Sequence, residues 1–226
     1  MSLFGNFMKA AKPDALCGAI MRGDSALAKK LLAKEKIDLD ATYGGYTALA
    51  WASGGYGAVH ASKELVQMLL ERHVNVNAPC EGGATALERA AMVNATDVVE
   101  TLVAAGADVN QKDGTSNTPL MTALLCRSEE AAVLLIEKGT EVDGCSTHSN
   151  CPGYSPLKLA VENNLTRAAG MLLDRGASLD GVEVSKYNRE MSEIVGRCLK
   201  ERNEKAVALA ERIPVFKTLK LKCQPG

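Results

Sequence analysis

A short apolar block recurs along the chain, and in four of its five copies a Thr or Ser stands directly before it. These residues are Thr47, Thr85, Thr118 and Ser155, while a degenerate copy begins at Asp14. The leucines that centre the five blocks are Leu16, Leu49, Leu87, Leu120 and Leu157, separated by 33, 38, 33 and 37 residues. A nearly constant period of this size indicates a chain built from repeated supersecondary units.

Each copy continues with a second apolar block, which predicts a second helix. An apolar pair follows fifteen residues after the central leucine in four copies, as Leu31-Leu32, Leu102-Val103, Leu135-Ile136 and Leu172-Leu173. Val98, Val99 and Leu102 have the spacing of a helix that buries one face. Glycines close this block in three copies, at Gly106, Gly139 and Gly176, and they predict helix ends in the left-handed conformation.

The residues around the first block predict a capped helix start. A Thr or Ser side-chain oxygen can accept a hydrogen bond from a backbone N–H that the helix leaves free. Pro119 and Pro156 fall at the first helical position, where the missing N–H costs nothing. A pair of short helices cannot bury its own apolar face, so several pairs must stack. Two steps exceed 33 residues because of insertions, which we place at 53–60 and 144–153.

Together these features resemble the ankyrin repeat family. The Thr-Pro-Leu opening, the apolar pair, the close Gly106-Ala107-Asp108-Val109-Asn110 and the 33-residue period are typical of that family. The resemblance implies an all-α solenoid of stacked helix-turn-helix units with β-hairpin-like loops. Its five repeats would occupy 14–180, at about 14–44, 45–82, 83–115, 116–152 and 153–180. The position that usually holds His in this family is occupied by Ala50, Glu88, Met121 and Lys158.

The segments outside the repeats have different patterns. Residues 1–13 would form an N-terminal extension or cap. Residues 181–212 predict a C-terminal capping helix with an apolar face and a charged face. The apolar face would carry Met191, Ile194, Val195, Cys198 and Leu199. The tail at 213–226 alternates apolar and basic residues, which fits an edge strand, a docking segment or, as we favour, a flexible tail.

Composition and charge narrow the class of protein. The 226 residues include 26 Lys plus Arg against 27 Asp plus Glu, which argues against nucleic-acid binding through general basicity. No stretch approaches the roughly 20 apolar residues that cross a bilayer, and the first residues lack a basic leader. We therefore expect no membrane association and a cytoplasmic location, with the nucleus as an alternative. Seven Cys in such a chain are expected to be reduced thiols, and a capped solenoid is expected to be a monomer.

Few residues suggest chemistry. No local Ser/His/Asp signature or phosphate-binding loop is found, so we expect no enzyme and no cofactor. Cys145, His148 and Cys151 supply three soft ligands within one insertion, whereas a structural zinc site needs four. An ordinary insertion is the favoured interpretation, and a redox-active Cys pair or a weak metal site are the alternatives.

The resemblance implies a scaffold that binds a partner protein or peptide in a concave groove formed by hairpin tips and first helices. In repeats 2–4 the candidate binding residues are Tyr43, Tyr46, Trp51, Tyr56, Arg89, Met92, Val93 and Leu125. Tyr, Trp and Arg often dominate the energy of an interface. Trp51 could equally pack against the adjacent repeat. The leading hypothesis is a non-catalytic adaptor, and the alternative is a redox- or zinc-responsive module built on the Cys145–Cys151 insertion.

Overall fold

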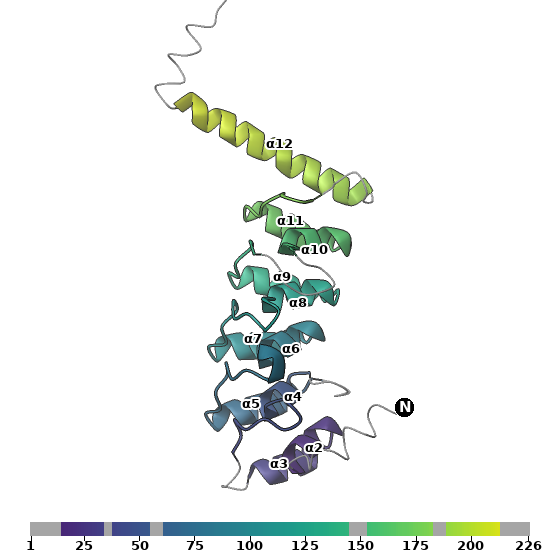
Figure 1. Cartoon of the computed structure of the whole chain (residues 1–226), viewed down its shortest axis with the longest axis vertical. Helices are drawn as coiled ribbons and strands as arrows, with labels where there is room; N and C mark the ends of the chain where they lie inside the picture. Colours follow the sequence, from purple (N-terminus) through teal and green to yellow (C-terminus); the bar gives the residue numbers. More distant parts are fainter. Residues whose placement is uncertain (1–14, 34–37, 55–60, 145–152, 183–188, 213–226) are drawn as a thin grey trace, which may run out of the picture.

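The protein is a stack of short antiparallel helix pairs, as the all-α solenoid prediction requires (Figure 1). The computed structural model describes residues 15–33, 38–54, 61–144, 153–182 and 189–212. The five pairs are α2 (Ala15–Met21) with α3 (Ser25–Leu32), α4 (Ala48–Ala52) with α5 (Lys63–Glu71), α6 (Ala86–Met92) with α7 (Thr96–Ala104), α8 (Pro119–Leu125) with α9 (Glu129–Glu137), and α10 (Pro156–Glu162) with α11 (Thr166–Asp174). A longer helix, α12 (Arg189–Arg212), follows the fifth pair, and a 3₁₀ turn, η1 (Glu81–Gly83), precedes α6.

The predicted N-caps are confirmed. The side chains of Thr47, Thr85, Thr118 and Ser155 each accept a hydrogen bond from the backbone N–H three residues later. Pro119 and Pro156 occupy the first positions of α8 and α10. These local contacts explain why each first helix begins at the same place in its repeat.

Left-handed residues end the helices at two recurring places. Gly106, Gly139 and Gly176 close the second helices with φ near +90°. Between the first and second helices, Asn94, Arg127 and Asn164 have φ between 58° and 60°. Gly23 holds the corresponding position of the first pair, with φ of 70°. The tight turn at each place reverses the chain, so that the two helices of a pair pack against each other.

The core runs through the whole stack and consists mainly of Leu, Ala and Val. Val98, Val99 and Leu102 on α7 are fully buried, as their helical spacing predicts. Each first helix packs on the first helix of the neighbouring pair, and each second helix packs on the next second helix. Small residues such as Ala50 and Ala90 are also fully buried, which allows the neighbouring helices to approach closely.

The loops between the pairs are joined by a ladder of hydrogen bonds from backbone to side chain. The side chains of Asp40, Asn77, Asn110 and Asp143 accept hydrogen bonds of 2.8–2.9 Å from backbone N–H groups of the following repeat. The donors are the N–H groups of Asn75, Asp108, Glu141 and Ser178. In each of these hydrogen bonds, the residue that closes one repeat accepts from the closing turn of the next repeat.

The loop tips also contact each other directly. Tyr43 and Tyr46 form an isolated antiparallel bridge across Gly44 and Gly45, both of which have positive φ, as a tight two-residue hairpin requires. The Gly45 carbonyl accepts from the Glu81 N–H at 2.6 Å. The described loops therefore follow the predicted hairpin-like form with very little strand structure.

The predicted C-terminal cap is present. Met191, Val195 and Cys198 are buried, and α12 packs on α11 at the end of the stack opposite α2 (Figure 1). Leu199 was expected on the same face, but 39% of its surface is exposed. Successive residues of an α-helix point about 100° apart, which places Leu199 at the edge of the face that Cys198 occupies. The predicted extension at 1–13 and tail at 213–226 lie outside the described residues.

Thr140 provides a test of packing in the ladder region. It occupies the place of Ala107 and Ala177 in their repeats and is buried, but its hydroxyl has no hydrogen-bond partner among the described residues. We expect Thr140→Val to raise the free energy of unfolding by about 1 kcal/mol, since it removes a buried, unsatisfied hydroxyl and keeps the side-chain shape. Chemical denaturation followed by circular dichroism measures this change.

Thr85→Val is the matched control, because the Thr85 side chain caps α6. It should lower the free energy of unfolding by about 1 kcal/mol. A loss of stability in Thr140→Val would contradict the assignment of an unsatisfied hydroxyl.

Candidate partner-binding surface

An aromatic cluster lies between the second and third helix pairs. The rings of Tyr46 and Trp51 meet edge to face, with centroids 4.9 Å apart and an interplanar angle of 62°. The Trp51 indole N–H donates to the Tyr43 carbonyl at 3.0 Å. The Arg89 guanidinium carbon lies 4.8 Å from the centre of the Tyr46 ring. The structure thus brings together four of the predicted binding residues.

Two of these four residues are not exposed, contrary to expectation. Trp51 has 2% of its surface exposed and Arg89 has 6%. Trp51 packs against the Tyr46 ring and donates to the Tyr43 carbonyl, and Arg89 is held over the Tyr46 ring, where a cation and an aromatic face attract. These contacts and the burial of Trp51 fit a packing role for this residue. Tyr43 and Tyr46 are half-buried at the hairpin.

The remaining described candidates lie at the carboxyl ends of the first helices. Val93, next to the end of α6, is 43% exposed, and Met92 and Leu125 are half-buried. Cys126 follows Leu125 and is exposed. We call Met92, Val93, Leu125 and Cys126 the helix-end surface. Gly54 packs so closely that an added Cβ would lie 2.7 Å from Val93, so the end of α4 supports this surface from one side.

Glu88 was not among the predicted binding residues, and it is buried between the third and fourth pairs. Its side chain is 7% exposed, and the Thr122 hydroxyl donates to it at 3.0 Å. Burial is the largest influence on its carboxyl group and raises its pKa to about 7, with the negative charge of Asp113 acting in the same direction. The available sign was an ionisable residue at the position that usually holds His in this family, where two other repeats carry Ala50 and Met121 and one carries Lys158.

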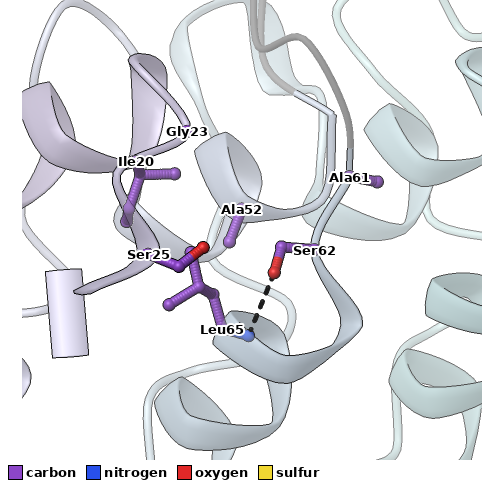
Figure 2. Close-up of a pocket in the computed structure, with 7 residues that line it drawn as sticks. All are labelled: Ile20, Gly23, Ser25, Ala52, Ala61, Ser62 and Leu65. Carbon is purple, nitrogen blue, oxygen red and sulfur yellow. Dashed lines mark hydrogen bonds between the residues drawn. The ribbon is translucent and has the colours of Figure 1, made fainter.

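A cavity of about 270 Å³ lies between the first and second pairs (Figure 2). Its wall includes Ile20 of α2 and Ala52 of α4, Gly23 and Ser25 at the start of α3, and Ser62 and Leu65 at the start of α5. The Ser62 hydroxyl caps α5 through a long hydrogen bond of 3.4 Å from the Leu65 N–H.

The cavity arises where a repeat-to-repeat contact is missing. In the third pair, Asn94 accepts a 2.9 Å hydrogen bond from Ala131, the third residue of α9. Gly23 holds the same position as Asn94 but has no side chain, and nothing lies within 4 Å of a Cβ built on it. The third residue of α5, Leu65, therefore lacks the contact that Ala131 receives. We interpret the cavity as a packing gap and not as a ligand site.

Some predicted residues lie outside the described part of the chain. These are Tyr56 and the weak metal candidates Cys145, His148 and Cys151. Among the described residues, no group of three or more His, Cys, Asp or Glu side chains is placed to hold a metal ion. The helices searched in the described segments include none that could span a membrane.

Comparison with known proteins identifies the repeats. The fold defines a stacked helical-repeat protein, and residues 16–113 match the family model described as ankyrin repeats, three copies. The chain therefore contains ankyrin repeats, which the family model matches over residues 16–113. It is 36% identical over 92 residues to ankyrin repeat and KH domain-containing protein mask-1 of Caenorhabditis elegans, covering 39% of this chain and 3% of that protein.

Two further proteins match the chain over stretches of similar length. Ankyrin repeat and SOCS box protein 11 of Danio rerio is 36% identical over 100 residues, 44% of this chain and 32% of that protein. Glycerophosphocholine phosphodiesterase gde1 of Schizosaccharomyces pombe is 32% identical over 90 residues, 40% of this chain and 8% of that enzyme. The match spans less than a third of each of these three relatives.

The cavity yields a direct test. We expect Gly23→Asn to raise the free energy of unfolding by about 1 kcal/mol, because its amide can enter the cavity and accept from the start of α5 as Asn94 does for α9. Asn also tolerates the left-handed conformation at this position. Thermal and chemical unfolding would measure the change.

Gly23→Ala is the control, since it has no amide and must adopt a φ of 70°. It should lower stability by about 1 kcal/mol. Equal destabilisation by both substitutions would show that the gap cannot accept a capping side chain.

Proposed function

We propose that this chain is a non-catalytic adaptor that binds one partner protein or peptide through repeats 2–4. Ankyrin repeats are generally protein–protein interaction modules, and the family is typically non-catalytic. The proposal assigns no catalytic residue and no cofactor. It includes a cytoplasmic or nuclear location, a monomeric state and the repeat boundaries at about 14–44, 45–82, 83–115, 116–152 and 153–180.

The observation that carries the proposal is the exposure of apolar side chains on the helix-end surface. Val93 is one of two large apolar side chains that are exposed among the described residues, and the other is Leu199 on α12. Met92 and Leu125, the last residues of α6 and α8, are half-buried and add apolar surface at the ends of these adjacent helices. An apolar area shared by adjacent repeats suits a partner that lies across them.

The buried aromatic cluster has a supporting role in this proposal. Trp51 and Arg89 hold the second and third pairs together beneath the surface, while Tyr43 and Tyr46 offer their half-buried edges. Tyr56 remains a proposed contact on the insertion. A redox- or zinc-responsive module built on Cys145, His148 and Cys151 remains the second candidate, and elemental analysis of purified protein would test it.

The test uses two double variants, each of which replaces two apolar side chains by Gln, at two different places on the molecule. Val93→Gln with Leu125→Gln alters the helix-end surface, whereas Val103→Gln with Ala104→Gln alters α7. Each pair combines one half-buried and one exposed residue. We expect the first double variant to bind a captured partner at least about tenfold more weakly, because each buried interface residue of this size contributes about 1 kcal/mol.

Binding to the α7 variant should be unchanged. Partners are recovered by affinity capture from lysate, and their dissociation constants are then measured with purified proteins. Circular dichroism checks that every variant is folded. Equal affinities for wild type and both variants would exclude the helix-end surface as the binding site.

A further inference from the structure

Glu88 is a carboxyl group buried in the contact between α6 and α8. The Thr122 hydroxyl on α8 donates to one of its oxygens at 3.0 Å, and 7% of the residue is exposed. The two helices pack closely along their apolar sides, where Leu87, Ala90 and Leu120 are fully buried. A charge in such a place loses most of its hydration.

The nearest positive group does not offset this loss. Arg89, the next residue on α6, directs its guanidinium toward the Tyr46 ring of the second pair, whereas Glu88 reaches Thr122 of the fourth pair. The attraction of Arg89 for the Glu88 carboxylate is the smaller effect, and burial is the larger. Arg89 therefore contacts the second pair, and Glu88 contacts the fourth pair.

The loop that leads into α8 carries a negative charge and one buried acceptor that no described group donates to. Asp113 has the same charge as Glu88 and is occupied by the N–H groups of Thr115 and Asn117 and by the Thr115 hydroxyl. The Asn117 side-chain oxygen is buried and has no donor among the described residues. The negative charge of Asp113 favours the neutral form of Glu88, because a protonated carboxyl group carries no charge for it to repel.

The other titratable groups that face Glu88 are two thiols. Cys80 lies in the loop before α6, and Cys126 lies at the end of α8. Burial raises the pKa of the Cys80 thiol, and partial desolvation of the Cys126 sulfur raises the pKa of that thiol although the residue is exposed, so both stay neutral at and below neutral pH.

From this arrangement we propose that Glu88 is a proton-responsive contact: its neutral form stabilises the packing of the third repeat on the fourth, and its ionised form weakens it. The proposal rests on the fold and is independent of the partner. It also concerns the binding surface, since Met92 and Leu125 end the same two helices.

The direction of the pH effect follows from the two states. In the unfolded chain Glu88 ionises around its ordinary pKa of 4.5, whereas burial raises the pKa in the folded chain to about 7. Below both pKa values Glu88 is neutral in the folded and the unfolded state, so it contributes no pH dependence to the free energy of unfolding. As the pH rises from 4.5 to beyond 7, the unfolded state releases its proton first, so folding stability falls.

The first experiment is a carbon-13 NMR titration of the Glu88 carboxyl in wild-type protein. It should show a midpoint well above the ordinary Glu value. In Thr122→Val the midpoint should move higher still, because the donated hydrogen bond that favours the carboxylate is removed. A wild-type midpoint at or below 4.5 would overturn the proposal without requiring any substitution.

The second experiment compares unfolding at pH 5 and pH 8 in wild type, Glu88→Gln and Glu100→Gln. Gln keeps an acceptor for Thr122 but cannot ionise, and Glu100 is an exposed control on α7. The unfolding constant of wild type should increase between these pH values by on the order of tenfold to a hundredfold more than that of Glu88→Gln. Groups that titrate elsewhere contribute equally to both. Glu100→Gln should follow wild type, and identical pH dependence in all three proteins would refute the role of Glu88.

Discussion

The structure depends on one constraint: no helix pair in this chain can bury its own apolar face. The first helices are only five to seven residues long, and helices of this length are not stable alone in water. Each pair must therefore be covered by the next one. The ladder of Asp40, Asn77, Asn110 and Asp143 adds a polar contact at every step. Stability is accordingly a property of the contacts between neighbours as much as of the repeats themselves.

Because the repeats share this geometry, their departures from each other are informative. Gly23 removes a side chain that the third pair uses to hold the fourth, and a cavity results. Glu88 and Arg89 place two buried ionisable groups on the central pair, each reaching a different neighbour. Thr140 adds a hydroxyl where two other repeats have Ala. These differences make some contacts between pairs stronger than others, so the array need not open evenly along its length.

The candidate site was less predictable than the fold. The structure places Tyr46 beside both Trp51 and Arg89, but repeat position did not reveal which of these residues would be covered. Trp51 and Val93 both belong to the end region of a first helix. Trp51 is almost fully buried and Val93 is 43% exposed. The difference comes from the neighbouring hairpin and from the ring of Tyr46, which lie over Trp51 and not over Val93.

The amino-acid sequence by itself determined the period, the helix starts, the turns and the capping helix. These features depend on residues a few positions apart, such as Thr85 with the N–H of Glu88, so local rules are sufficient. Only the tertiary structure decided the exposure of the binding candidates, the gap beside Gly23 and the environment of Glu88. The gap beside Gly23 and the environment of Glu88 depend on residues of the next repeat, such as Thr122, which lies 34 positions after Glu88. The burial of Trp51 depends on how the hairpin residues Tyr43 and Tyr46 fold over it. Burial and charge are set by which atoms of the neighbour arrive there, and the spacing of residues within one repeat does not contain that information.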